Sequence, residues 1–128
     1  MKTIRVVAAI IKNEDKVFTT QRGYGDFEGG WEFPGGKIEE GESKEVALIR
    51  EIKEELAVEI SVDKYVLTVE YDYPNFHLTM DCFLCSLRNG DIKLMEHSSA
   101  KWLDKYSLDS VDWLPADIEV VNELKKIL

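Results

Sequence analysis

Apolar residues along the chain follow two spacings, one typical of strands and one typical of helices. The longest uninterrupted apolar run is Val6 to Ile11. The β-branched runs Ile4 to Ile11 and Val17 to Thr20 are separated by polar residues 12–16, which predicts a β-hairpin. Further strands are predicted at Trp31 to Phe33, Val58 to Val62, Tyr65 to Tyr73, Phe76 to Leu87 and Ala100 to Leu103.

Two segments have helical spacing. Lys44 to Leu56 contains no Gly or Pro and follows Ser43, a suitable N-cap residue. Pro115 is well placed in the first turn of a second helix near the C-terminus. The apolar stripes that we expect to be buried are Val46, Ile49, Ile52 and Leu56 on the first helix and Ile118, Val121, Leu124 and Leu128 on the second.

The segments between these elements are short. The glycine-rich segment Tyr24 to Gly30 predicts a mobile loop, Pro34-Gly35-Gly36 ends the strand before it, and Asn89-Gly90 predicts a tight turn. No linker, low-complexity tract or repeat divides the chain, so residues 1–128 are predicted to form a single domain. The fold class is α+β, with a mixed β-sheet, one internal helix and one C-terminal helix.

Charge limits the partners that we expect. The chain has 16 Lys and Arg against 25 Asp and Glu, a formal net charge of −9. An acidic surface repels phosphate backbones, so duplex nucleic acid is not an expected partner, and no apolar run is long enough to enter a membrane. Cys82 and Cys85 lie in an apolar strand and are predicted to be buried, reduced thiols, which suits a cytoplasmic protein.

The internal helix carries three carboxylates close together. At about 100° per residue, Glu51, Glu54 and Glu55 share one sector, roughly opposite the centre of the predicted apolar stripe. Crowded carboxylates repel one another unless a cation neutralises them, and their oxygens suit Mg²⁺ or Mn²⁺. By themselves the residues also fit a solvated acidic face.

The spacing of these acids resembles the signature of the Nudix family. That signature reads Gly, five residues, Glu, seven residues, then Arg-Glu-apolar-x-Glu-Glu-x-Gly-apolar. The chain matches it at Gly36, Glu42, Arg50, Glu51, Ile52, Glu54, Glu55 and Val58, and departs from it at Ala57, where the family has Gly. Because Gly tolerates a left-handed helix end, Ala57 predicts an altered helix end or a small cost in stability, without loss of activity.

The resemblance extends along nearly the whole chain, to the MutT-like branch that includes CTP pyrophosphohydrolases. It is carried by Gln21-Arg22, Trp31 to Lys37, Glu96-His97 followed by Trp102, and Leu114 to Ile118. It implies a single Nudix domain of α/β/α sandwich type. It also implies metal ligands (the Gly35 carbonyl, Glu51, Glu54, Glu55 and Glu96), catalytic residues (Glu51, Glu54, Glu96 and Arg50, supported by Glu42) and substrate contacts (Arg22, Lys37, Phe33, Phe76 and Asp117).

The implied reaction is Mg²⁺-dependent hydrolysis of a nucleoside triphosphate to a monophosphate and pyrophosphate, with Mn²⁺ as a substitute. CTP, dCTP or a modified nucleotide such as 8-oxo-dGTP is the expected substrate. A sugar nucleotide, ADP-ribose, and a role as a non-catalytic nucleotide sensor are the alternatives. Either Glu54 or Glu96 would activate water. We expect a cytoplasmic monomer or weak homodimer.

Two side-chain roles remain to be weighed. An ionised Asp117 only accepts hydrogen bonds and would select a base that carries an amine, although Asp is also ordinary in the first turn of a helix. His97 could tune the neighbouring Glu96 carboxylate or contact phosphate, but a lone loop His is more often incidental, and His77 is assigned no function.

Overall fold

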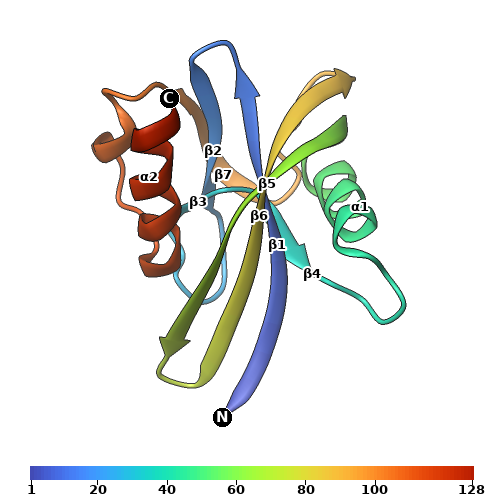
Figure 1. The fold of residues 1–128 in the computed structure, drawn as a ribbon, viewed down its shortest axis with the longest axis vertical. Coiled ribbons are helices and arrows are strands. Elements are labelled where there is room, and N and C mark those ends of the chain that lie inside the picture. The colour runs from blue at the N-terminus through green and yellow to red at the C-terminus, as the bar shows by residue number, and fades with distance from the viewer.

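A mixed sheet lies between two helices in the computed structural model, which describes residues 1–128 (Figure 1). Helix α1 lies on one side of the sheet and α2 on the other, as the predicted sandwich requires. The elements are β1 (Lys2–Asn13), β2 (Lys16–Arg22), β3 (Trp31–Glu32), β4 (Gly35–Lys37), α1 (Lys44–Leu56), β5 (Glu59–Tyr73), β6 (Phe76–Asn89), β7 (His97–Leu103), a short 3₁₀ helix (Leu108–Ser110) and α2 (Pro115–Ile127). Neither α-helix is long and apolar enough to span a bilayer.

Strand β1 is the centre of the sheet. The strand order is β3-β2-β1-β6-β5, with β4 also paired to β1 and β7 to β2. The β1–β6 ladder is parallel and runs from Lys2 opposite Phe76 to Ile11 opposite Cys85, whereas the other ladders are antiparallel. The α+β fold with a mixed sheet is therefore confirmed.

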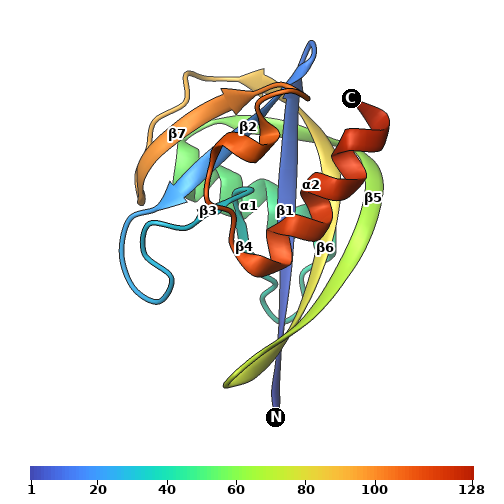
Figure 2. The same ribbon diagram turned by 90° about the vertical axis from the view of Figure 1, so that its left-hand side faces the viewer.

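The apolar run of β1 supplies both layers of the core. Because side chains alternate along a strand, Val7, Ala9 and Ile11 pack in the cluster beneath α1, while Ala8 and Ile10 pack beneath α2. Figure 2 shows α2 crossing the sheet on the side that carries the second cluster. A run that is apolar on both faces thus marks a strand that is covered on both sides.

The two cysteines are buried, reduced and on opposite faces, as predicted. Cys82 packs in the α2 cluster and Cys85 in the α1 cluster, and neither forms a disulfide. Burial raises the pKa of both thiols, to about 12 for Cys85. These cysteines are therefore core residues without thiolate reactivity.

Helix α1 begins and ends where the sequence predicts, but its predicted buried stripe is partly wrong. The Ser43 hydroxyl accepts a hydrogen bond from the Val46 amide at 3.2 Å, which confirms the N-cap. However, Val46 and Ile49 are exposed, and the buried residues are Ala47, Leu48, Ile52, Glu55 and Leu56. The helix is rotated about its axis relative to the prediction, so that Ala47 and Leu48 pack in the core and Glu55 lies on the inward face.

The second helix differs from its prediction in the same way. Val121 and Leu124 are buried as expected, whereas Ile118 is exposed and Asp117 is buried. Here too an acidic residue occupies an inward position that an apolar residue was expected to fill. In both helices, therefore, helical spacing alone predicted the wrong buried residues near an acidic side chain that faces inward.

Two strand predictions also need correction. Gly35–Lys37 forms β4, although Pro34-Gly35-Gly36 was expected to end strand structure, because Gly35 and Gly36 pair with Ala8 and Val7 of β1. The two strands expected within residues 58–73 form one strand, β5, with register irregularities between Val62 and Lys64 and between Tyr65 and Leu67. The polar Asp63-Lys64 pair marks this bulged region and not a turn.

Candidate active site

Two glycines of β4 allow a carboxylate of α1 to approach the sheet. A Cβ at Gly35 would overlap the Val7 carbonyl, so only Gly lets β4 approach β1 this closely. A Cβ at Gly36 would overlap the carboxylate of Glu51. The glycines of the Nudix-like segment thus hold space for Glu51 against the sheet edge.

Arg50 binds the acidic residues around it. Its Nε and Nη2 atoms donate to the two Glu42 oxygens at 2.7 and 2.8 Å. Its Nη1 atom donates to Glu51 at 3.0 Å and to Glu54 at 3.3 Å, and Nη2 also donates to the Lys37 carbonyl at 3.1 Å. The paired hydrogen bonds from Arg50 lower the pKa of Glu42 to about 2. Arg50 therefore links α1 to the preceding loop and orients two of its carboxylates.

Glu55 is the buried member of the acidic group. Its side chain is only 8% exposed, and its Oε2 atom is buried without a hydrogen-bond partner. Burial, reinforced by the charges of Glu51 and Glu96, raises the pKa of Glu55 to about 9. An ionised carboxylate that is buried without a full set of hydrogen bonds costs free energy unless a cation or a proton neutralises it.

His97 lies against Glu55, which the sequence did not predict. Its Nε2 atom is 3.4 Å from Glu55 Oε1, and its side chain is 5% exposed. Burial lowers the pKa of His97. The expectation that His97 lies in a loop is therefore wrong, since it is the first residue of β7 and its side chain is buried.

The donor set fits a hard divalent cation such as Mg²⁺. All of its members are oxygens, Glu55 Oε2 has no other partner, and Gly36 leaves the carboxylate of Glu51 unobstructed. No three Asp, Glu, His or Cys side chains are already arranged to hold an ion. Glu51 and Glu54 are instead hydrogen-bonded to Arg50, and Glu54 is largely exposed. The ligand set Gly35, Glu51, Glu54, Glu55 and Glu96 therefore stays a prediction.

Two cavities meet beside this acidic group. The polar one is lined by Glu55, Glu96 and His97, together with residues 24–26 of the loop after β2. The apolar one has a volume of about 130 Å³ and opens to solvent, so it is smaller than the roughly 300 to 1,000 Å³ usual for sites that enclose a whole small molecule. Arg22, Glu32 and Gly35 line both cavities, so they stand at the junction.

Arg22 and Glu32 form a bidentate ion pair at this junction. Arg22 Nη2 and Nε donate to the Glu32 oxygens at 2.7 and 3.0 Å. Arg22 Nη1 donates to the Asp26 carbonyl at 3.1 Å, which ties the loop to the pair. The hydrogen bond to Glu32 raises the pKa of Arg22. Sequence reasoning assigned no role to Glu32, because nothing in its local pattern indicates a partner.

Asp117 is a buried acidic residue in the wall of the apolar cavity. Its Oδ1 atom accepts a hydrogen bond from the Phe33 amide at 3.0 Å, and its side chain lines the cavity. Burial raises the pKa of Asp117 to about 8. A protonated carboxyl can donate as well as accept, so both forms of Asp117 bear on base recognition near neutral pH. Its role in reading the base stays a prediction.

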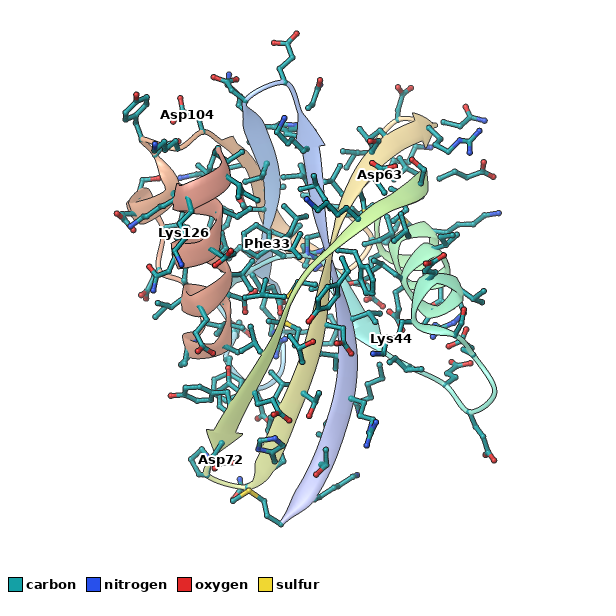
Figure 3. All side chains as sticks on the ribbon, viewed as in Figure 1. Phe33, Lys44, Asp63, Asp72, Asp104 and Lys126 are labelled. Carbon is teal, nitrogen blue, oxygen red and sulfur yellow. The ribbon has the colours of Figure 1, made fainter.

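Aromatic rings form much of the apolar cavity wall. Phe33 and Phe76 both line it, and Figure 3 shows Phe33 between α2 and the strands. Their contact with a substrate stays a prediction. Phe33 stacks on Trp113 with ring centres 4.9 Å apart. Tyr73 stacks on Phe76 at 5.1 Å and contacts Phe27 at 5.0 Å. Tyr73 and Phe27 were missed because alternation marks Tyr73 as an ordinary strand residue and Phe27 lies in a loop.

Lys37 is the one predicted substrate residue that lines neither cavity. Its exposed side chain extends from β4, and only its carbonyl takes part in the site, as an acceptor for Arg50.

Ala57 ends α1 in the left-handed conformation, with φ 58° and ψ 31°. The helix end therefore keeps the geometry of a glycine cap, at the cost that Ala incurs there.

Fold and site together define an enzyme with a carboxylate-rich centre beside an aromatic pocket. The model of the NUDIX domain family matches residues 1–124, and the chain belongs to the Nudix family of hydrolases. It is 34% identical over 123 residues to the CTP pyrophosphohydrolase of Escherichia coli K12, covering 95% of this chain and 91% of that protein. It is 32% identical over 129 residues to the 8-oxo-dGTP diphosphatase of the same strain, covering 99% and 100%. The solution structure of the E. coli ORF135 protein superposes with a TM-score of 0.85 at 32% identity, covering 99% of this chain and 91% of that one.

Proposed function

We propose that the protein hydrolyses a nucleoside triphosphate to a nucleoside monophosphate and pyrophosphate, using Mg²⁺. The observation that carries this proposal is the junction of two unlike cavities. One is aromatic and suits a base, the other is lined by carboxylates, and Arg22 lies between them. A nucleotide has the same two unlike parts joined end to end. The named activities of the two E. coli relatives support the same substrate class.

Each group of residues has a defined task in this reaction. Glu51, Glu54, Glu55, Glu96 and the Gly35 carbonyl would hold the cation. Bound there, Mg²⁺ would shield the phosphate charge, make a water more acidic and stabilise the leaving oxygen. Glu54 or Glu96 takes the proton of the water that attacks the β-phosphorus. The bond from that phosphorus to the bridging oxygen of the α-phosphate breaks, which releases the monophosphate.

Arg22 is placed to bind phosphate. Three of its five N–H donors are used by Glu32 and the Asp26 carbonyl, which leaves two for an anion at the junction. Arg50 acts from a distance, since it binds Glu51 and Glu54 and keeps their oxygens in place. Lys37 is exposed beside the carboxylate group and would contact the outer phosphates.

The base is expected to be cytosine or a modified purine such as 8-oxoguanine. Asp117 keeps one oxygen for the Phe33 amide and can present the other to the base edge. Phe33, Phe76 and Tyr73 supply ring surfaces for the base. A hydrolase for ADP-ribose or a sugar nucleotide would have the same catalytic carboxylates, so the substrate panel must include these compounds.

The decisive test resolves products by chromatography. Metal-free protein with added Mg²⁺ is incubated with CTP, dCTP, 5-methyl-dCTP, dATP, dGTP, 8-oxo-dGTP, UTP, ADP-ribose and a sugar nucleotide. We expect monophosphate and pyrophosphate in equal amounts from the preferred triphosphate. Glu54→Gln should lower kcat by at least about 100-fold while leaving the fold intact. Glu45→Gln, an exposed acid on the same helix, is the matched control and should keep full activity.

Three outcomes would contradict the proposal. Cleavage of ADP-ribose or the sugar nucleotide alone would assign the site to diphosphate substrates. Absence of cleavage together with tight nucleotide binding would make the protein a sensor. Equal activity of Glu54→Gln and the wild type would show that the carboxylate cluster has been misassigned.

A further inference from the structure

The segment before β7 is bound directly to the end of α1. The amides of Lys93 and Met95 donate to the carbonyls of Leu56 and Glu55 at 2.8 and 3.0 Å. These carbonyls belong to the last turn of the helix, where no intrahelical donor is available. Their pairing holds residues 93–97 beside Glu55, although the two segments are far apart in the sequence.

A bulge then turns His97 towards the helix. Gln21 pairs with Ser99 but Arg22 pairs with His97, so Ser98 is an extra residue in β7. The extra residue shifts the alternation of side chains by one. His97 consequently takes the face of Ala100 and Trp102, which pack on the α1 side of the sheet. Gly23 permits this arrangement, because a Cβ there would crowd the Glu96 carbonyl at 2.9 Å.

The contact that results is buried and incompletely satisfied. His97 Nε2 lies 3.4 Å from Glu55 Oε1, with both side chains more than nine-tenths buried. The opposite atoms of the pair, His97 Nδ1 and Glu55 Oε2, have no hydrogen-bond partner. Buried polar atoms without partners are costly, so they mark a place that another ligand completes. Glu55 Oε2 faces no other protein donor and is therefore the oxygen left for a cation.

We propose that His97 is a positioning residue that fixes the carboxylate of Glu55, so that Oε1 faces the imidazole and Oε2 faces the divalent cation. The inference rests on the proposed function only in taking Glu55 as a cation ligand. In this role His97 acts through Glu55 and is not itself a ligand of the cation. Through His97, β7 and the Glu96 segment are joined to the carboxylate face of α1.

The experiment measures Mn²⁺ binding to the metal-free protein by titration calorimetry. His97→Leu removes the imidazole but fills the buried space, whereas His97→Gln keeps an N–H group near the position of Nε2. We expect His97→Leu to weaken Mn²⁺ binding by roughly 10- to 100-fold, and His97→Gln to stay within a few-fold of wild type. Ser98→Ala, at the adjacent exposed residue, is the matched control and should bind as the wild type does.

A second measurement tests whether the effect passes through Glu55. In a Glu55→Gln background, His97→Leu should weaken Mn²⁺ binding no further. If His97→Leu weakens Mn²⁺ binding as much in the Glu55→Gln background as in the wild type, the proposal is overturned. It is also overturned if His97→Leu and His97→Gln weaken Mn²⁺ binding equally, because that would indicate a role in packing alone. Circular dichroism and the melting temperature of each metal-free variant verify folding.

Hydrolysis of the nucleotide panel is assayed separately from binding. If the wild type binds Mn²⁺ in the predicted pattern but cleaves no triphosphate, the proposed function fails and the role of His97 stands. If triphosphates are cleaved but His97→Leu binds Mn²⁺ as tightly as the wild type, the role of His97 fails and the proposed function stands.

Discussion

At the scale of single residues, Ala57 adopts a backbone conformation that is strained for any residue with a Cβ atom. The position requires a left-handed conformation, and Ala adopts it with φ 58° while its amide donates to the Lys53 carbonyl at 3.0 Å. The strain is compatible with the fold because the last turn of α1 is also held by Lys93 and Met95. Having Ala57 in place of the Gly of the family signature therefore lowers the stability of the fold but does not change the backbone geometry of the helix end.

Replacing Ala57 with Gly should stabilise the protein. We expect the free energy of unfolding to rise by about 1 kcal/mol, because Gly adopts this conformation without a clash of its Cβ. Urea unfolding measures the change, and kcat with the preferred nucleotide should not move. A destabilised Ala57→Gly variant would mean that the Ala57 methyl group makes a contact worth more than the strain.

Asp117 should make base preference depend on pH. Its pKa of about 8 means that the group passes from protonated donor to ionised acceptor as the pH rises. The ionised fraction grows from about a tenth at pH 7 to about nine tenths at pH 9. The ratio of kcat/KM for CTP over UTP should therefore rise roughly tenfold across this range.

The control for this prediction is Asp117→Asn, which cannot ionise. Its CTP to UTP ratio should be constant from pH 7 to pH 9. If the wild type and Asp117→Asn show the same pH dependence, Asp117 does not read the base and serves only to bind the Phe33 amide.

At the scale of elements, the β5–β6 hairpin carries a charge cluster at its tip. His77 Nδ1 lies 2.6 Å from Asp72 and Nε2 lies 3.2 Å from Glu70, on strands that pair directly. Figure 3 shows Asp72 at this end of the molecule, away from α1. The hydrogen bond to Asp72, followed by that to Glu70, raises the pKa of His77. The cluster is a feature of the hairpin and takes no part in the site.

Stability of the hairpin should therefore depend on pH. Because the folded-state pKa of His77 is raised above 6.5, its contribution is fully present below pH 6.5 and is lost as the pH rises through the folded value. His77→Gln should lower the urea midpoint at pH 5.5 and have little effect at pH 9. An NMR titration of His77 checks the pKa directly, and an unshifted value would exclude the ion pairs in solution.

At the scale of the whole molecule, the site joins parts that are otherwise separate. Helix α1, strand β4 and the segment before β7 all place oxygens at the polar cavity or beside it. The net charge of −9 and the buried Glu55 both oppose this gathering of carboxylates. A bound cation should therefore stabilise the native protein as well as support its activity.

Added Mg²⁺ should raise the melting temperature, and EDTA should reverse the rise. At a free concentration of about 100 times Kd, the expected gain is about 2.7 kcal/mol in the free energy of unfolding. Glu55→Gln should lose most of this gain, while Glu45→Gln should keep it. An equal rise in the melting temperature of both variants would mean that Mg²⁺ binds elsewhere on the acidic surface.

Features that depend on the spacing of neighbouring residues could be predicted from the sequence. The bounds of α1, its Ser43 cap and the acids Glu51, Glu54 and Glu55 on one helix follow from residues close together in the chain. The same holds for the buried, two-sided run of β1. These features were predictable because helical and strand periodicity are set by the backbone.

How these elements meet could not be predicted from the sequence and is seen in the folded protein. The rotation of α1 that buries Glu55 and exposes Ile49, and the pairing of Glu55 with His97, depend on contacts between distant segments. So does the cavity in which Tyr73 and Asp117 meet. Periodicity shows which residues share a face of an element, but it does not show which other element covers that face. A polar site residue can also occupy an inward position where apolar spacing alone would predict an apolar side chain.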